Sequence, residues 1–571
     1  MYKYKVVKDS EGKVKHIETS LTGTALLNFP TLNKGNAFSF AERRAFGLLG
    51  KLPDYVSTLE EQVENCYIQY CNIQNDLARH IYLTSLLDRN EVLFYKLVNK
   101  YLIEMLPIVY TPTVGLAVEK YSSEFRRPRG LYIAYPDQEY MDEILENSTN
   151  HEVDLILVTD GEGVLGIGDQ GIGGMAISVG KLMVYTLCAG IDPKRVLPVQ
   201  LDVGTNNEQL LNDPLYLGWR HTRISGKEYD DFIARFIAMV QRKFPNAYVH
   251  WEDLGKENAQ RVLKQYRDKI CTFNDDMQGT GAVTLAGLLS AMKALDQKIS
   301  EQRIVIHGAG TAATGIAEQI MDAMMREGLT EEQARSRFWL LGRHGLLRAE
   351  STTIADFQRS FARSREQLAD WEIENPDMIS LYDVVKNVKP TILIGCSTAT
   401  GAFNEAVVKE MYKHTSHPII FPLSNPTSKS EAHPKDLIEW TDGNALIATG
   451  SPFAPIEYKN RTYVISQSNN AYIFPGLGLG VIAAKAHRVT DGMIWAACDK
   501  LSECAPISDD KFAPLLPPLT EVQEISKKIA LAVALKAREE GVAQVSAEVD
   551  LAKAVEENFW QPEYHPFVRV D

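Results

Sequence analysis

The sequence lacks the features that define several classes of protein. Its seven cysteines are an odd number and form no CxxC pair, which is unlike a disulfide framework or a zinc ribbon and typical of reduced thiols in a cytoplasm. Residues 1–16 are polar and contain no apolar core of a signal peptide. No uninterrupted apolar run of about 18 residues occurs, so we expect no membrane span.

An excess of positive charge is also missing. The 571 residues carry a formal net charge of -14, which argues against nucleic acid or an anionic membrane surface as a partner. An anionic substrate would therefore have to be attracted by local cations. We expect a cytoplasmic protein that acts on a small molecule.

The composition and length are those of a multidomain globular protein. The chain is 45% hydrophobic and 23% charged, and its length favours about three or four domains. Helical patterns give way to alternating strands and helices, which predicts an α/β fold. We expect four parts: a helical N-terminal domain (1–125), a central parallel-sheet domain (126–278, completed by 467–535), a Rossmann-type dinucleotide-binding domain (279–466) and a short C-terminal tail (536–571). The tail is aromatic, so we expect it to pack on the body or on another subunit.

The N-terminal part contains amphipathic stretches at 59–70 and 81–106. It ends in residues 107–113, where Pro107 and Pro112 should hold the backbone extended around Tyr110. A tyrosine in this position is either a packing residue or a positioned acid.

A buried lysine is predicted in the central part. Strand patterns cover 153–159 and 196–203, and a helix is expected over 172–189 with Lys181 among apolar neighbours. Lys181 could extend its amine to solvent. If the amine is instead desolvated beside a cation, its pKa could fall enough for it to act as a base.

Two acidic pairs stand out in residues 251–281. Glu252-Asp253 and Asp275-Asp276 each follow a short apolar run, and a helical segment separates them. A strand, a helix and a second strand would bring both pairs to one edge of a parallel sheet. Carboxylates gathered there would suit Mg²⁺ or Mn²⁺, which favour oxygen ligands. The alternative is a set of helix caps and solvated loop acids.

A dinucleotide-binding motif follows the strand predicted at 303–307. Gly308, Gly310 and Ala313 form GxGxxA between this strand and a helix that extends through Met325, which is the context that the motif requires. The next strand, at 338–341, is followed by Gly342-Arg343-His344 and not by the acid that would hold the ribose of NAD. A basic residue there can accommodate the phosphate of NADP, so NAD and NADP both remain open.

Further strands are expected at 391–395, 419–423 and 445–448. Asn425 follows one of them, and Asn470 lies on a later polar loop. Each asparagine could be a turn former or could recognise a carboxylate or nicotinamide.

Several long motifs occur together in one order. They are Tyr110–Gly115, Val158–Glu162, Gly180–Leu182, Leu201–Asn206, Trp251–Asp253, Phe273–Thr280 and Ser424–Thr427. With these motifs the chain resembles the malic enzymes, in particular the bacterial NAD-linked type, over essentially its whole length.

The resemblance implies oxidative decarboxylation of L-malate to pyruvate and CO2 with reduction of NAD. It also implies roles for individual residues and a homo-oligomer built as a dimer of dimers. The implied roles are metal ligands for Glu252, Asp253 and Asp276, general base for Lys181, general acid for Tyr110, a carboxylate beside the lysine for Asp275, cofactor and substrate contact for Asn425, and substrate contact for Asn470.

One position departs from the family pattern. In many malic enzymes an arginine that pairs with a malate carboxylate follows the Thr-Asp-Gly-Glu motif, but here Gly163 stands there. Arg129 and Arg223 are possible substitutes. Malolactic enzymes, which convert malate to lactate and retain NAD, resemble this chain at Gly163, so malolactic activity is the enzymatic alternative. A catalytically inert NAD- or metabolite-binding subunit is the alternative of another class.

Overall fold

The computed structural model describes residues 4–9, 12–148, 152–164, 166–352, 354–508, 510 and 512–571. Its contacts divide the chain into two compact units. Unit 1 comprises Met1–Leu157, Gln170–Pro245 and Ala552–Asp571, and unit 2 comprises Val158–Asp169 and Asn246–Leu551. The division into four parts predicted above stays a prediction.

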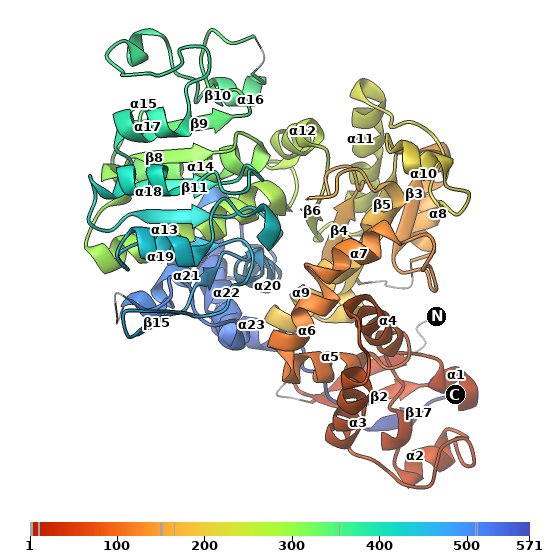
Figure 1. The fold of residues 1–571 in the computed structure, drawn as a ribbon. Coiled ribbons are helices and arrows are strands. Elements are labelled where there is room, and N and C mark those ends of the chain that lie inside the picture. Colours follow the sequence, from red (N-terminus) through yellow and green to blue (C-terminus); the bar gives the residue numbers. More distant parts are fainter. Residues whose placement is uncertain are drawn as a thin grey trace. The chain divides into compact units, whose positions relative to one another are not determined.

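The two ends of the chain share a small sheet in unit 1. Strands β1 (Tyr4–Lys8) and β2 (Val14–Thr19) pair antiparallel, and β17 (Phe567–Arg569) pairs parallel with β2 (Figure 1). The Phe567 ring meets Phe38 and Phe46 edge to face at 5.8 and 6.2 Å. The prediction that the aromatic tail packs on the body is therefore confirmed.

One predicted helical stretch of unit 1 is divided into several helices. The stretch 81–106 belongs to three helices and not to one, because Asn90 caps the middle helix by accepting a bond from the Leu93 N–H at 3.0 Å. The helices here are α3 (Leu59–Cys71), α4 (Asp76–Leu87), α5 (Glu91–Lys100), α6 (Leu102–Val109) and α7 (Thr113–Glu119).

The prediction of extended backbone around Tyr110 was wrong. Pro107 lies inside α6, Tyr110 is the residue that ends this helix, and α7 begins at Thr113 after a cis Thr111–Pro112 bond. The apolar residues of α6, several of them buried, stabilise the helix by packing despite the proline.

The remainder of unit 1 is α/β. Strands β3 (Leu131–Ala134) and β5 (Val196–Asp202) pair in parallel. The second of these strands was predicted at 196–203. Helix α9 (Met175–Ala189) packs on β5 and α7, and thirteen of its residues are buried. Helix α11 (Gly226–Lys243) buries Phe232, Phe236 and Val240 at a spacing of four residues.

Two helical stretches of the described chain are long and apolar enough to cross a membrane by composition, Leu102–Glu119 and Gly171–Ala189. The first consists of α6 and α7, and 89% of the second is buried inside the protein. Burial on this scale is what a core helix requires.

Unit 2 contains the strand–helix–strand predicted around the acidic pairs. Strand β6 (Tyr248–Trp251) and β7 (Thr272–Asn274) pair in parallel, and α12 (Lys256–Tyr266) connects them. A π-helical turn (Asp275–Gly279) then leads into α13 (Thr280–Leu295). Strand β4 (Leu155–Thr159) begins in unit 1, and its last two residues belong to unit 2.

A seven-stranded sheet forms the larger part of unit 2, in the order β10-β9-β8-β11-β12-β13-β16. All neighbours are parallel except β10 and β9. The strands are β8 (Ile304–His307), β9 (Phe338–Gly342), β10 (Gly345–Leu346), β11 (Ile392–Gly395), β12 (Ile419–Pro422), β13 (Leu446–Thr449) and β16 (Ser466–Gln467). Each predicted strand of this region is present, within one or two residues of its expected bounds.

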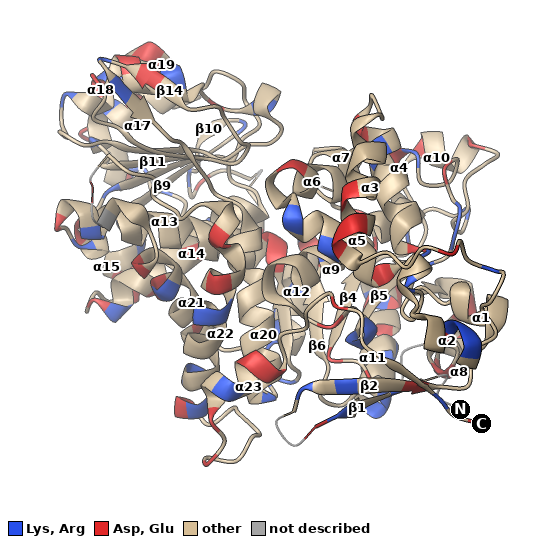
Figure 2. Ribbon diagram, turned by 90° about the horizontal axis from the view of Figure 1, so that it is seen from below, with Lys and Arg blue, Asp and Glu red and all other residues tan. Residues whose placement is uncertain are grey.

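Helices cover both faces of this sheet. Helices α17 (Leu381–Val388), α18 (Glu405–Tyr412) and α19 (Pro434–Trp440) lie on one face, and α13 and α14 (Thr311–Arg326) lie on the other (Figure 2). Helices α20 (Phe474–Ala484), α21 (Asp491–Glu503) and α22 (Val522–Glu539) pack on one another in the same unit. The layers are those of a Rossmann-type domain, as predicted.

Candidate active site

Three carboxylates of unit 2 come together where β6 and β7 end. The register pairs Trp251 with Asn274, so the residues that follow each strand lie beside one another. Glu252, Asp253 and Asp276 each offer an oxygen within 4.8 Å of the others, and the first two are 4% exposed. The predicted gathering of the two acidic pairs is therefore present, and hard-oxygen donors of this kind, two buried and Asp276 partly buried, fit Mg²⁺ or Mn²⁺.

The turn at Asp253 is fixed by its backbone. Asp253 has a φ of 52°, in the left-handed region that a non-glycine residue rarely adopts. Its N–H donates to Asp276 Oδ2 at 2.9 Å, and its carbonyl accepts from the Gly163 N–H at 2.8 Å. These bonds hold the turn in a conformation that costs free energy, which is common at functional sites.

The backbone around Gly163 leaves no space for a Cβ. A Cβ added at residue 163 would lie 2.5 Å from the Leu254 carbonyl oxygen and 3.3 Å from that of Asp253. The neighbouring Glu162 accepts a bond from Asn258 Nδ2 at 3.1 Å. The chain therefore passes against the acid-bearing turn too closely for any side chain at position 163 without a backbone shift.

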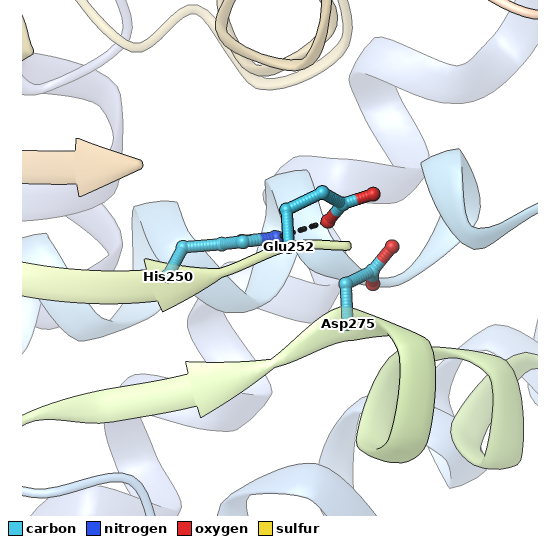
Figure 3. Close-up of side chains that lie close together, drawn as sticks. All are labelled: His250, Glu252 and Asp275. Carbon is cyan, nitrogen blue, oxygen red and sulfur yellow. Dashed lines mark hydrogen bonds and ion pairs between the residues drawn. The ribbon is translucent and has the colours of Figure 1, made fainter. Parts of the chain in front are cut away.

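His250 was not singled out in the sequence, yet it contacts one of the three acids. His250 is fully buried, and its Nε2 lies 2.8 Å from Glu252 Oε2 (Figure 3). The Phe273 and Phe474 rings meet the imidazole edge to face at 5.6 and 5.8 Å. The alternation of side chains along a strand could have indicated His250, because it stands two positions before Glu252 and such side chains point to the same face.

Asp275 lies near His250 and Glu252 and has two further polar neighbours. Asn470 Nδ2 donates to Asp275 Oδ2 at 2.9 Å and lies 3.1 Å from Thr280 Oγ1. Asp275 is 1% exposed, and a Cβ at Gly279 would collide with its carboxylate. Asn470 and Asp275 were both singled out in the sequence, and the structure brings them together.

Lys181 and Tyr110 meet in unit 1. Lys181 is 2% exposed on α9, and its Nζ lies 5.2 Å from the centre of the Tyr110 ring. Gly180 permits this approach, because a Cβ there would lie 3.1 Å from Tyr110 Cδ2. At 2% exposure the Lys181 side chain does not extend to solvent, so the snorkelling alternative is wrong.

The two arginines considered as substitutes differ in their surroundings. Arg129 Nη2 donates to Asp88 Oδ1 at 2.7 Å and to the Thr84 carbonyl at 2.8 Å, which ties it to α4. Arg223 is 9% exposed. Burial raises the pKa of the Asp202 carboxyl. Bonds from the Trp219 and Gly204 N–H groups and the positive charge of Arg223 act in the opposite direction. Arg129 thus has a structural partner.

The glycine-rich turn lies between β8 and α14, as the motif requires. Gly308 has a φ of 125°, and a Cβ there would lie 2.6 Å from the Cys396 carbonyl oxygen. Gly310 is the N-cap of α14, and Ala313 is fully buried in its first turn. Backbone N–H groups at such a helix start can bind a pyrophosphate. Gln358 Nε2 donates to the Ala309 carbonyl within the same turn.

Glycine is not required by packing at the end of β9. A Cβ at Gly342 would lie 3.5 Å from Leu347 Cδ2 and 3.8 Å from Ala309 Cβ, which are ordinary contacts. Arg343 and His344, both exposed, form the turn into β10. The backbone at Gly342 therefore accepts a Cβ without a shift.

Asn425 lies in a loop that is held by the buried acid Glu431. Its Oδ1 accepts a bond from Ser451 Oγ at 2.6 Å, and the Asn425–Pro426 bond is cis. The fully buried Glu431 accepts from the Ser397 N–H at 2.8 Å and from Ser424 Oγ, so it joins the loops after β11 and β12. Sequence reasoning missed Glu431, because no local pattern distinguishes it from a surface acid.

Comparisons with known proteins agree along the chain. Residues 277–538 match the family model "Malic enzyme, NAD binding domain", and residues 87–267 match "Malic enzyme, N-terminal domain". The chain is 53% identical over 548 residues to an NAD-dependent malic enzyme of Photorhabdus laumondii, covering 96% of this chain and 97% of that protein. A similar enzyme of Proteus mirabilis is 52% identical over 547 residues, with the same coverage.

Two solved structures share the fold. A malic enzyme of Entamoeba histolytica aligns with a TM-score of 0.55 and 22% identity over 90% of each chain. A malic enzyme of Pyrococcus horikoshii aligns with a TM-score of 0.53 and 21% identity over 80% of this chain and 88% of that one.

Proposed function

The chain belongs to the malic enzyme family, and from this premise we propose which of its residues carry out the reaction of an NAD-dependent malic enzyme. That reaction is the oxidative decarboxylation of L-malate to pyruvate and CO2 with reduction of NAD. The activity follows from identities of 50–53% to enzymes of that name over 96% of the chain. The observation that supports the residue roles best is the convergence of three acids in unit 2, two of them buried.

Glu252, Asp253 and Asp276 are the residues we assign to a divalent metal. Their oxygens converge within 4.8 Å, and carboxylates are the donors that Mg²⁺ and Mn²⁺ prefer. When bound, such an ion supplies Lewis-acid polarisation of the malate C2 hydroxyl and of the adjacent carboxylate. The Asp253 N–H holds Asp276 Oδ2, which orients that carboxylate.

Lys181 is the residue we assign as general base. Its side chain is buried, and a lysine amine in its neutral form can accept the proton of the C2 hydroxyl. NAD, when bound, accepts the hydride from C2. Tyr110, whose ring lies 5.2 Å from the amine, is assigned as the acid that protonates C3 after CO2 has left. Asp275 is assigned as the third catalytic group.

The nucleotide and substrate contacts complete the assignment. Gly308, Gly310 and Ala313 would face the pyrophosphate of NAD at the start of α14. Asn425 is assigned to cofactor and substrate and Asn470 to substrate, since each is a polar side chain on a loop near strand ends. The basic turn at Arg343 supports some use of NADP beside NAD.

The alternatives are less favoured. Malolactic activity was suggested by Gly163, but the relatives named above, at 52–53% identity, are NAD-dependent malic enzymes. An inert binding subunit would not need Tyr110, Lys181 and the three acids together.

The cellular location and the oligomeric state are part of the same proposal. We expect a cytoplasmic enzyme, in keeping with seven free cysteines, and a homo-oligomer built as a dimer of dimers. Apolar side chains on two helices of unit 1 support an interface: Ile68 is 62% exposed and Ile103 is 53% exposed. Light scattering on the purified protein should give a tetramer mass, and a monomer mass would contradict this assembly.

Metal removal tests the assignment. Protein stripped with EDTA should lose malate oxidation and regain it with Mn²⁺ or Mg²⁺, while NADH still binds. A Glu252→Gln variant should require far more Mn²⁺ for the same rate. Full activity in metal-free buffer would contradict the metal assignment.

A further inference from the structure

One side chain outside the assigned set touches it directly. His250 is the third residue of β6, Glu252 is the first residue after this strand, and the two side chains meet at 2.8 Å. Figure 3 shows the second Glu252 oxygen pointing away from the imidazole. The carboxylate therefore has one oxygen engaged by the ring and the other directed elsewhere.

The imidazole has little freedom to move. His250 is fully buried, with Phe273, Phe474 and Tyr248 edge to face around it at 5.6, 5.8 and 6.5 Å. The strand fixes its backbone, because β6 is paired with β7 through this residue and Phe273. A donor held in this way presents its N–H to Glu252 at one place only.

We propose that His250 is a positioning residue for the metal site: its Nε2–H holds one oxygen of Glu252 so that the other is preorganised as a metal ligand. This inference rests on the proposed function, since it presumes that Glu252 binds the metal. A residue that orients a metal-binding carboxylate in this way affects metal affinity by about 10–100-fold. The positioning role of His250 requires no contact with substrate or cofactor.

A second arrangement competes with this one. His250, Glu252 and Asp275 also offer three ligand atoms within 4.8 Å of one another. If His250 itself bound the ion, a nitrogen ligand would favour Mn²⁺ or Zn²⁺ over Mg²⁺. If His250 only positions Glu252, all protein ligands of the ion are oxygens. The preference between Mn²⁺ and Mg²⁺ should then stay the same when another hydrogen-bond donor replaces the imidazole.

Two substitutions separate these roles. His250→Gln keeps an N–H that can reach Glu252, whereas His250→Leu fills the space without a donor. Mn²⁺ affinity, measured by the EPR signal of free Mn²⁺ in a titration without substrate, should fall about 10–100-fold in His250→Leu and stay close to the parent value in His250→Gln. In turnover assays His250→Leu should raise the Mn²⁺ concentration needed for half activity much more than it lowers kcat at saturating Mn²⁺.

The controls keep the result interpretable. Tyr248→Phe removes a hydroxyl from the same buried strand and leaves the His250–Glu252 pair in place, so its Mn²⁺ affinity should match the parent. Circular dichroism and NADH binding report whether each variant is folded. A folded His250→Leu with parental Mn²⁺ affinity would overturn the proposal, and so would a His250→Gln variant that is as impaired as His250→Leu.

Failure of the proposed function would appear differently. If Glu252→Gln and Asp276→Asn both bind Mn²⁺ as the parent does, the metal assignment itself is wrong. If those two variants lose Mn²⁺ and His250→Leu does not, only the role of His250 is wrong.

Discussion

The Lys181 amine lies 5.2 Å from the centre of the Tyr110 ring, with both residues in unit 1. The lysine is 2% exposed, and an amine at this distance from an aromatic ring lies within the range of a cation–π interaction. The assigned base and the assigned acid therefore lie beside one another.

Replacing the base should stop the oxidation step. Lys181→Met keeps much of the volume and apolar surface but removes the amine, so malate oxidation should fall by about 10²–10⁴-fold. NADH binding, followed by its fluorescence, should be unchanged because the nucleotide turn lies on α14. Unchanged turnover in a folded Lys181→Met variant would remove Lys181 from the mechanism.

Tyr110→Phe should act on a later step. The variant keeps the ring that faces Lys181 and loses the hydroxyl that protonates C3, so pyruvate formation should slow by about 10²–10⁴-fold. Reduction of oxaloacetate by NADH, which needs no proton at C3, should be affected much less. Equal loss of both partial reactions would point to a structural role for Tyr110.

The close approach at Gly163 predicts a stability effect. Gly163→Ala places a Cβ 2.5 Å from the Leu254 carbonyl oxygen, so we expect a loss of about 1–3 kcal/mol in the free energy of unfolding. Gly115→Ala is the control, because a Cβ there meets nothing within 4 Å. Denaturant titration measures both, and a Gly163→Ala variant as stable as the parent would show that the turn can yield.

The end of β9 predicts the nucleotide preference. In Gly342→Asp the Cβ would meet only ordinary contacts, and a carboxylate there would bind the ribose hydroxyls of NAD and repel the phosphate of NADP. The ratio of kcat/KM for NAD over NADP should rise by about 10–100-fold, the range of a hydrogen bond to a charged group. Arg343→Ser should shift the same ratio in the same direction. An unchanged ratio in both variants would place ribose recognition elsewhere.

A buried acid in unit 1 predicts a pH effect. Burial raises the pKa of Glu91 to about 7, with the charge of Asp192 adding to the rise and Lys194 opposing it. The folded state then binds more protons than the unfolded state between the ordinary pKa of 4.5 and about 7. Stability should therefore fall as pH rises through this window and should level off above it.

Glu91→Gln removes the titration, so its melting temperature should fall less than that of the parent between pH 5 and pH 8. Glu60→Gln, on the exposed side of α3, is the control and should melt in parallel with the parent. Parallel melting curves for Glu91→Gln and the parent would contradict the raised pKa.

Local patterns predicted the parts of the site that lie next to strands. The acidic pairs were placed correctly because parallel strands of similar length bring their carboxyl ends to one edge. The glycine turn was placed correctly because Gly308 and Gly310 stand between a clear strand and a clear helix. The break before α5 was missed, since capping by Asn90 competes with an apolar periodicity that continues on both sides of it.

Long-range contacts account for the remaining differences. The pairing of β17 with β2 joins the two ends of the chain, and no periodicity within either segment encodes it. His250 and Glu431 were missed for the same reason, because their importance lies in what they contact and not in the residues beside them. The packing of Leu254 on Gly163 is a further example.

Product analysis tests directly whether the protein decarboxylates malate oxidatively. Purified protein with L-malate, NAD and Mn²⁺ should form NADH and pyruvate in equal amounts, and the same mixture without metal should form neither. Lactate without net NADH would contradict oxidative decarboxylation and would establish malolactic conversion in its place.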